Sequence, residues 1–168
     1  MKVSAVITAH NDVPTLSSAI ASVFAQSYKA DEVIVVDDGS KDATSEVAKN
    51  YEGVSLLRQK EMGRFSACNN GVMMASLAWI AFLDAKETWA DKQLQQQVAF
   101  HRKNLLIKAS VYTKDGVLTL QDALSNGRVN RSDVMIEKVL YERLGGFDEA
   151  FEVFEDDELW MRVVVDLK

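Results

Sequence analysis

The first hundred residues alternate between continuous apolar runs and segments with helical spacing. Four apolar runs are predicted strands, at residues 3–8, 32–38, 54–58 and 79–83. The run EVIVV in the second of them is typical of a strand that is covered on both faces. After the first run, Leu16, Ile20 and Val23 recur at the spacing of one helix face. Repeated strand-then-helix units of this kind predict a parallel, right-handed α/β sheet.

The second part of the chain has a weaker pattern. Between residues 101 and 130, a hairpin-like turn at Lys114-Asp115-Gly116 predicts short strands. Residues 134–146, with the sequence VMIEKVLYERLGG, predict one helix that ends at its two glycines. The segment FEDDELWMRVVV, residues 154–165, predicts a last helix with acidic side chains in its first turn.

Length and composition suit one folded domain, because the chain has 168 residues of which 48% are hydrophobic. We expect a single Rossmann-like α/β domain over residues 1–168, with a mainly parallel sheet flanked by helices. The net charge of −6 and the lack of basic runs argue against nucleic acid as the main partner. The single cysteine, Cys68, fits a reducing compartment, and no apolar stretch approaches the ~20 residues of a transmembrane helix. These features predict a cytoplasmic protein without a transmembrane segment.

Polar side chains follow three of the predicted strands at the points where those strands end. They are Thr8 and Asn11 after the first strand, Asp37 and Asp38 after the second, and Asp84, Lys86 and Glu87 after the fourth. Ligands bind beyond the carboxyl ends of parallel strands, because loops and helix N-termini converge there. Side chains of these types are also common in turns and at helix N-termini, so each cluster alone fits a turn or a helix cap as well as a ligand site. Three clusters at one edge of a sheet favour a ligand site.

Seven segments of the chain follow one another in an order that is typical of one enzyme family. They are VSAVITAHND, ASVFAQSY, EVIVVDDGSKDAT, GRFSACNNGV, WIAFLDAKETW, GGFDEAF and FEDDELWMRV. With these segments the chain resembles glycosyltransferase family 2, whose members are inverting nucleotide-sugar enzymes with the A-type fold. The resemblance covers nearly the whole chain.

The resemblance implies roles for the strand-end residues. Thr8 and Ala9 match the positions where the family's first strand meets the nucleobase, and Asp38 matches the aspartate that hydrogen-bonds the base, usually uracil. Asp84 matches the first acid of the family's Asp-x-Asp motif, which faces the ribose and the metal-bound diphosphate. The same nucleotide-sugar site is expected to include Asn11, Asp37 and Lys86.

The resemblance also implies an acceptor side and a catalytic base. Gly146 and Asp148 match the turn before the family's acceptor loop, and Trp160 is assigned to the same side, although packing in the core is the more usual role of a tryptophan. Asp156, which follows Glu155, matches the catalytic base. Inverting transfer needs such a carboxylate to remove a proton from the acceptor hydroxyl as its oxygen attacks the anomeric carbon. Acids also favour a helix N-terminus without any catalytic role.

Two positions depart from the family pattern. Lys86 stands at the second acid of the Asp-x-Asp motif, which leaves Asp84 and Glu87 as candidate ligands of Mg²⁺ or Mn²⁺. The Lys86 ammonium is expected either to face the diphosphate oxygens in place of the metal, or to point into solvent and pair with a surface acid. Cys68 stands where the family usually has an arginine, and Arg64 is near enough in the sequence to replace it.

We therefore expect an inverting glycosyltransferase that moves a sugar from a nucleotide diphosphate sugar, with uridine as the expected nucleoside, to a saccharide or lipid-linked acceptor. Residues 1–100 would bind the nucleotide, and residues 101–168 would bind the acceptor and supply the base, with peripheral membrane association. The alternative is a catalytically degenerate domain that binds a nucleotide sugar or a partner protein, which is favoured by Lys86, Cys68 and the end of the chain at Lys168. A Rossmann-like dehydrogenase is disfavoured because no Gly-x-Gly-x-x-Gly follows the first strand.

Overall fold

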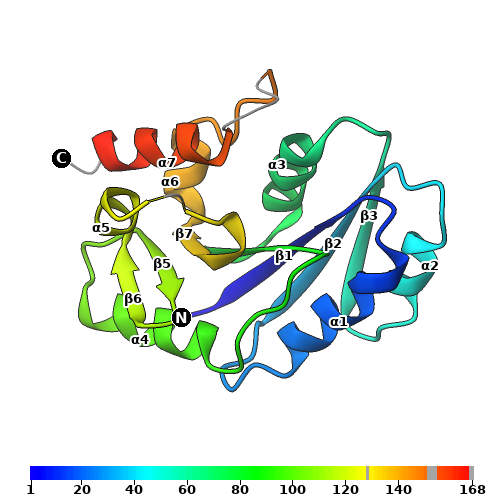
Figure 1. Cartoon of the computed structure of the whole chain (residues 1–168), viewed down its shortest axis with the longest axis horizontal. Helices are drawn as coiled ribbons and strands as arrows, with labels where there is room; N and C mark the ends of the chain where they lie inside the picture. Colours follow the sequence, from blue (N-terminus) through cyan, green and yellow to red (C-terminus); the bar gives the residue numbers. More distant parts are fainter. Residues whose placement is uncertain (128, 151–154, 167–168) are drawn as a thin grey trace.

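The computed structural model describes residues 1–127, 129–150 and 155–166, with the side chains of Glu155 and Asp156 outside that description. The strands are β1 Val3–Ala9, β2 Glu32–Asp38, β3 Val54–Gln59, β4 Trp79–Asp84, β5 Ala109–Thr113, β6 Gly116–Thr119 and β7 Val134–Glu137. The helices are α1 Val13–Phe24, α2 Thr44–Lys49, α3 Arg64–Met74, α4 Gln93–Lys103, α5 Leu120–Ser125, α6 Lys138–Arg143 and α7 Glu155–Asp166, with a short 3-10 helix, η1, at Arg131–Asp133. Within the described residues the strands form one seven-stranded sheet in the order β3-β2-β1-β4-β7-β5-β6 (Figure 1).

The N-terminal part of the sheet is parallel. β1 lies between β2 and β4 and runs parallel to both, and β3 continues the parallel order on the far side of β2. In the register, Thr8 lies opposite Asp84 and Ala9 lies opposite Asp37. The predicted parallel α/β arrangement is confirmed, and the polar strand ends meet at one edge as the sequence predicted.

The C-terminal part of the sheet is antiparallel. β5 and β6 form the predicted hairpin, with Thr113 paired to Gly116, and β7 lies between β4 and β5. The prediction of one helix over residues 134–146 is wrong, because this segment forms β7 and then α6. A short apolar run fits a buried strand or a buried helix equally well by its spacing. The segment forms a strand because β4 and β5 pair with it on either side and satisfy the backbone hydrogen-bonding groups of the buried residues 134–136.

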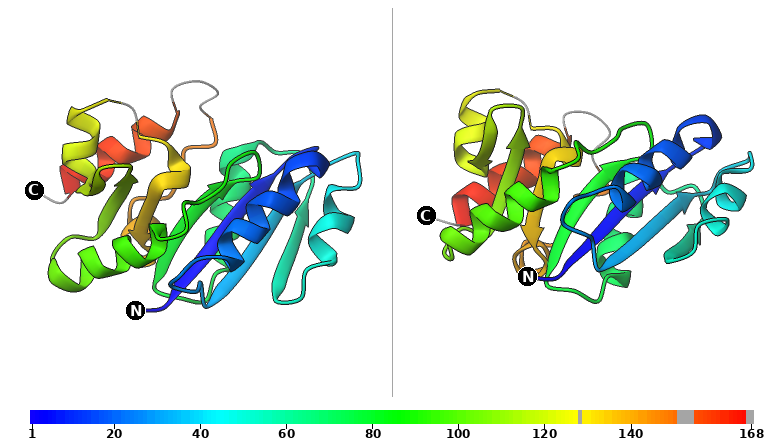
Figure 2. Two further views of the ribbon diagram at one scale, coloured as in Figure 1. Left: turned by 60° about the horizontal axis from the view of Figure 1, so that its bottom comes forward. Right: turned by 90° about the horizontal axis from the view of Figure 1, so that it is seen from below.

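Helices cover both faces of the sheet (Figure 2). On one face, α1 and α4 bury Leu16, Ile20 and Leu94 against the sheet. On the other face, α3, α6 and α7 pack over β1, β4 and β7. Gly71 of α3 allows close contact, because a Cβ at this position would lie 2.4 Å from Cγ1 of Val6. No helix among the described residues has the length and apolar character needed to cross a membrane.

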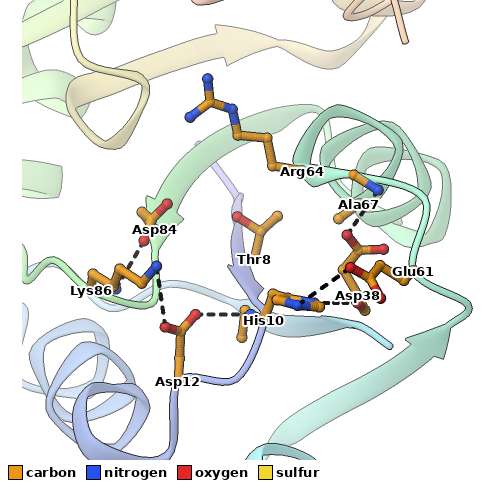
Figure 3. Close-up of a pocket in the computed structure, with 11 residues that line it drawn as sticks. Thr8, His10, Asp12, Asp38, Glu61, Arg64, Ala67, Asp84 and Lys86 are labelled. Atoms are coloured by element: carbon orange, nitrogen blue, oxygen red, sulfur yellow. Dashed lines mark hydrogen bonds and ion pairs between the residues drawn. The ribbon is translucent and has the colours of Figure 1, made fainter. Parts of the chain in front are cut away.

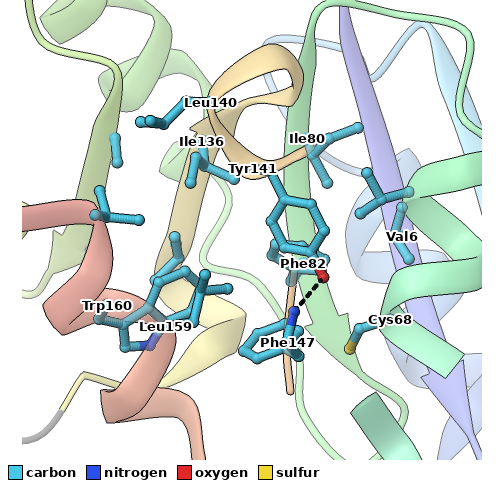
Figure 4. Packing of buried hydrophobic residues seen from close by; sticks show 14 of the residues in the cluster. Val6, Cys68, Ile80, Phe82, Ile136, Leu140, Tyr141, Phe147, Leu159 and Trp160 are labelled. Carbon is cyan, nitrogen blue, oxygen red and sulfur yellow. Dashed lines mark hydrogen bonds between the residues drawn. The ribbon is translucent and has the colours of Figure 1, made fainter. Parts of the chain in front are cut away.

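An aromatic cluster joins the two parts of the sheet on the α3 and α7 face (Figure 4). Phe147 lies at its centre, with ring centroids 5.9 Å from Phe82 and 5.4 Å from Trp160. The Trp160 side chain has 0% exposed surface. It therefore packs in the core and has no surface with which to contact an acceptor, which corrects its assignment to the acceptor side.

Candidate functional site

A pocket with a volume of about 390 Å³ opens at the carboxyl ends of β1, β2 and β4 (Figure 3). It is lined by Thr8, Ala9, His10, Asp12, Asp38, Glu61, Gly63, Arg64, Ala67, Asp84 and Lys86. Five of these residues were predicted for a nucleotide-sugar site, namely Thr8, Ala9, Asp38, Asp84 and Lys86. They lie together because the parallel register brings the three strand ends to one edge of the sheet.

The Asp38 carboxylate holds the loop that follows β3. Its oxygens accept hydrogen bonds from Nε2 of Gln59 at 2.8 Å, from the backbone N–H of Met62 at 2.8 Å and from that of Gly63 at 2.9 Å. An ionised carboxylate has about four acceptor positions. These donors of the described residues occupy three of them, which leaves acceptor capacity for one further donor.

Asp37 and Asn11, both predicted for the nucleotide-sugar site, are not among the described residues that line the pocket. Asp37 has 0% exposed surface and accepts hydrogen bonds from the Ser40 N–H at 2.9 Å and from the Ser45 hydroxyl. Burial alone would raise the pKa of Asp37, but the hydrogen bonds from Ser40 and Ser45 lower it below its ordinary value. Asn11 accepts a hydrogen bond from the Lys41 N–H at 2.8 Å. Both residues thus stabilise the loops around the pocket.

Asp84 at the end of β4 is bound to groups from two parts of the chain. Its Oδ1 accepts a hydrogen bond from the Lys86 N–H at 2.9 Å, and its Oδ2 lies 3.3 Å from Nη2 of Arg131. The Arg131 side chain is only 4% exposed. Sequence reasoning missed Arg131, which is 47 residues away and carries no motif. The placement of β7 beside β4 brings it to the site.

Lys86 lies at the rim of the pocket and is 69% exposed (Figure 3). Its Nζ is 3.7 Å from Oδ1 of Asp12, an acid that the sequence analysis did not select. Across the pocket, His10 is also newly placed in the site, with Nδ1 2.6 Å from the Asp38 carbonyl oxygen and Nε2 3.7 Å from Glu61. Lys86 and Asp12 therefore form an ion pair on one side of the pocket, and His10 contacts Asp38 and Glu61 on the other.

The first turn of α3 contributes Arg64 to the pocket, as the sequence analysis allowed. The Arg64 guanidinium lies 5.1 Å from the centre of the Phe65 ring. Cys68, one turn further along α3, has 0% exposed surface and packs in the core with Phe82. Position 68 thus faces the core in this chain, and a basic group reaches the pocket from position 64.

The donor groups at the predicted metal position do not fit a divalent cation. A metal ion bound to Asp84 would share the carboxylate with Arg131, which lies 3.3 Å from Oδ2, and the Glu87 carboxylate, which is not among the described groups lining the pocket, accepts a hydrogen bond from Nδ2 of Asn130 at 2.8 Å. Among the described residues, no three His, Cys, Asp or Glu side chains are arranged to hold a metal ion. A lysine ammonium about 4 Å from a divalent ion would be repelled by about 8 kcal/mol at an effective dielectric of 20.

The predicted acceptor turn is held from two sides. The carbonyl oxygen of Gly146 accepts a hydrogen bond from Nη2 of Arg162 in α7 at 2.8 Å, and the Phe147 N–H donates to Oδ1 of Asn69 in α3 at 3.0 Å. Asp148 lies in the same turn, where it is exposed and accepts a hydrogen bond from the Ala150 N–H at 2.9 Å. The predicted catalytic residues Glu155 and Asp156 begin α7, but their side chains lie outside the described residues.

A sequence model of glycosyl transferase family 2 matches residues 4–152. The chain belongs to this family. The uncharacterized glycosyltransferase RP339 of Rickettsia prowazekii is 24% identical to it over 183 aligned residues, and the putative glycosyltransferase EpsE of Bacillus subtilis is 28% identical. The alignments cover 95% and 96% of this family 2 chain, but only 58% and 66% of those two relatives.

Solved structures share the fold of this family 2 chain. The crystal structure of S. aureus TarS 1-349 matches it with a TM-score of 0.80 and 17% identity over 97% of this chain and 55% of that chain. TarS 1-349 in complex with UDP-GlcNAc has a TM-score of 0.79 and 17% identity, covering 97% and 53%. The mannosyltransferase PcManGT from Pyrobaculum calidifontis, in complex with GDP-Man and Mn²⁺, has a TM-score of 0.81 and 20% identity, covering 96% and 51%. At these identities the likeness establishes the A-type glycosyltransferase fold alone.

Proposed function

We propose that this family 2 chain binds a nucleoside diphosphate sugar in the pocket at the ends of β1, β2 and β4 and transfers the sugar, with inversion, to an acceptor hydroxyl. One observation carries the proposal. Thr8, Asp38 and Asp84, which come from three different strands, line the same pocket, and this is the position at which open α/β sheets bind nucleotides.

Uridine is the proposed nucleoside. Asp38 has acceptor capacity for one more N–H donor, and the imide N–H of uracil is such a donor. The complex of TarS, a protein of the same fold, with UDP-GlcNAc supports the proposal, whereas PcManGT is in complex with GDP-Man. Because guanine also carries a ring N–H, GDP is the comparison that tests the choice of base.

Asp156 is the proposed general base, because its position in the FEDDELW segment matches that of the family's catalytic base. In inverting transfer the acceptor oxygen attacks the anomeric carbon, its proton passes to the carboxylate, and the bond to the nucleoside diphosphate breaks. General-base catalysis of this kind contributes ~10² to 10⁴ in rate. The proposed acceptor is a saccharide or lipid-linked saccharide, as in polysaccharide assembly, and this part rests on the family resemblance.

Asp156→Asn is expected to lower sugar transfer by at least about 100-fold and to change UDP affinity by less than about twofold, since only the transition state uses the proton acceptor. Transfer is measured as UDP release from a panel of UDP-sugars with saccharide acceptors, and affinity by calorimetric titration with UDP and GDP. Asp157→Asn, the same change one residue further along α7, is the matched control and should retain transfer.

A protein of the same fold that binds nucleotide sugars without catalysis is the second candidate. It is favoured by Lys86 at the position of a family acid and by the Arg131 ion pair to Asp84. UDP binding by the unmodified protein without transfer to any acceptor would support this candidate. Wild-type transfer by Asp156→Asn would instead contradict the assignment of the base, and equal affinity for UDP and GDP would contradict the choice of uridine.

A further inference from the structure

We infer that the pocket binds a nucleoside diphosphate through cations of the protein itself, without a divalent metal ion. The inference rests on the proposed function, because it concerns the diphosphate part of the same ligand. Three observations support it: the ion pair between Asp84 and Arg131, the position of Lys86, and Arg64 at the first position of α3.

The negative charge of Asp84 is already compensated by the protein. Arg131 is 4% exposed and lies 3.3 Å from Oδ2, and the Lys86 N–H donates to Oδ1 at 2.9 Å. Moving the Asp84 carboxylate away from the buried Arg131 guanidinium would take a charged partner from it in a poorly solvated place, which is unfavourable. A metal ion that bound Asp84 would have to displace Arg131 or share its carboxylate with it. Asp84 therefore serves as the anchor of a buried guanidinium at the edge of the pocket.

Lys86 is placed to move toward a ligand at little cost. Its side chain is 69% exposed, and its partner, Oδ1 of Asp12, is 3.7 Å from Nζ. The pair is longer than a hydrogen bond, and the other oxygen of Asp12 keeps a hydrogen bond from the His10 N–H at 2.8 Å, so the ammonium can leave Asp12 for a more highly charged partner. The flexible lysine stem carries a point charge with three donors, which suits the oxygens of a diphosphate.

The charges in the pocket are separated by side (Figure 3). Asp38 and Glu61 lie on the β2 side, where loop N–H groups and His10 are their partners. On the β4 side, Asp84 and Lys86 lie together, and Arg64 extends over the pocket from the start of α3. The N-terminal end of a helix also carries partial positive charge.

The β4 side therefore presents Lys86 and Arg64 beside the carboxylates of Asp12 and Asp84, and Arg131 lies buried behind Asp84. The Lys86 ammonium would repel a divalent cation bound at Asp84, whereas it would attract the negatively charged oxygens of a diphosphate. An ammonium that binds the diphosphate does not need the coordination shell that a metal ion needs. Lys86, at the position of the family's second acid, is the group that distinguishes metal-free binding of a diphosphate from binding through a metal ion.

The inference is tested by calorimetric titration of the whole chain with UDP, once in EDTA and once with Mn²⁺. For the wild-type protein we expect the two dissociation constants to agree within about threefold. Lys86→Asp restores the second acid of the family's Asp-x-Asp motif. We expect this variant to bind UDP at least tenfold more weakly in EDTA and to need Mn²⁺ for binding. Lys86→Ala should show the loss in EDTA without the gain from Mn²⁺.

Lys92→Asp is the matched control, because Lys92 is exposed in the turn before α4, is not among the described pocket residues, and undergoes the same change of charge. It should bind UDP like the wild type under both conditions. Circular dichroism establishes that each variant is folded. An affinity of the wild type that rises tenfold or more with Mn²⁺ overturns the inference and leaves the proposed function standing. Unchanged binding by Lys86→Ala in EDTA also overturns it. A wild type that binds neither UDP nor GDP under either condition overturns the proposed function, and the inference with it.

Discussion

Asp133, the last residue of η1, is a half-buried carboxyl group with another acid as its neighbour. Burial, together with the charge of Glu87, raises the pKa of Asp133 from 3.8 to about 6. Between these two values the folded protein binds more protons than the unfolded chain, so this group makes the folded state less stable as the pH rises from about 4 to about 6. We expect Asp133→Asn to match the wild type near pH 4 and to be more stable by about 1 to 3 kcal/mol at pH 7.

Urea unfolding at both pH values measures this difference. His101 titrates in the same range with the opposite effect, because burial lowers its pKa to about 4 and its contribution to stability falls as the pH drops from 6.5. That contribution is present in both proteins and cancels in the comparison. Asp115→Asn, the same change at an exposed position, is the control. It should change the free energy of unfolding by the same amount at both pH values. An Asp133→Asn variant that is less stable than the wild type at pH 7 would contradict the expectation.

The Asn69 side chain of α3 forms hydrogen bonds with α6 and with the turn that follows it. Oδ1 of Asn69 accepts hydrogen bonds from the Tyr141 hydroxyl at 2.6 Å and the Phe147 N–H at 3.0 Å, while Nδ2 donates to the Phe147 carbonyl at 2.9 Å. Asn69→Ala leaves these buried groups without their partner, so we expect a loss of about 1 to 3 kcal/mol in the free energy of unfolding. Asn70→Ala removes a single hydrogen bond, to Gln59, and should cost less than about 1.5 kcal/mol. Equal losses in urea unfolding would contradict this role of Asn69.

The sheet is continuous from β3 to β6, and both of its faces carry buried tryptophans. Trp89 packs on the α1 and α4 face, and Trp160 packs on the α3 and α7 face. Because both clusters share the same strands, we expect one cooperative transition, in which tryptophan fluorescence and far-ultraviolet circular dichroism give the same urea midpoint. This measurement also tests the prediction of a single domain over residues 1–168. Two separated transitions would show instead that the parallel and antiparallel parts unfold independently.

The parallel strands and the residues at their ends could be predicted from the sequence. Apolar runs with helical segments between them repeat over short distances, so local periodicity was enough to predict these elements. The pocket positions of Thr8, Asp38 and Asp84 follow from that order, since parallel strands bring their carboxyl ends to one edge. The roles of Asp156 and Gly146 in catalysis and acceptor binding stay predictions.

Other features depend on partners that are distant in the sequence, and they became visible only in the folded chain. Residues 134–137 form a strand because neighbours on both sides satisfy their backbone groups, which spacing along the chain does not reveal. That strand in turn brings Arg131 to Asp84. Asp37 and Asp38 are adjacent acids at the end of β2, yet one is fully buried and the other lines the pocket, because successive side chains of a strand point to opposite faces. A charge acquires its role from what surrounds it, and those surroundings are assembled only when the chain folds.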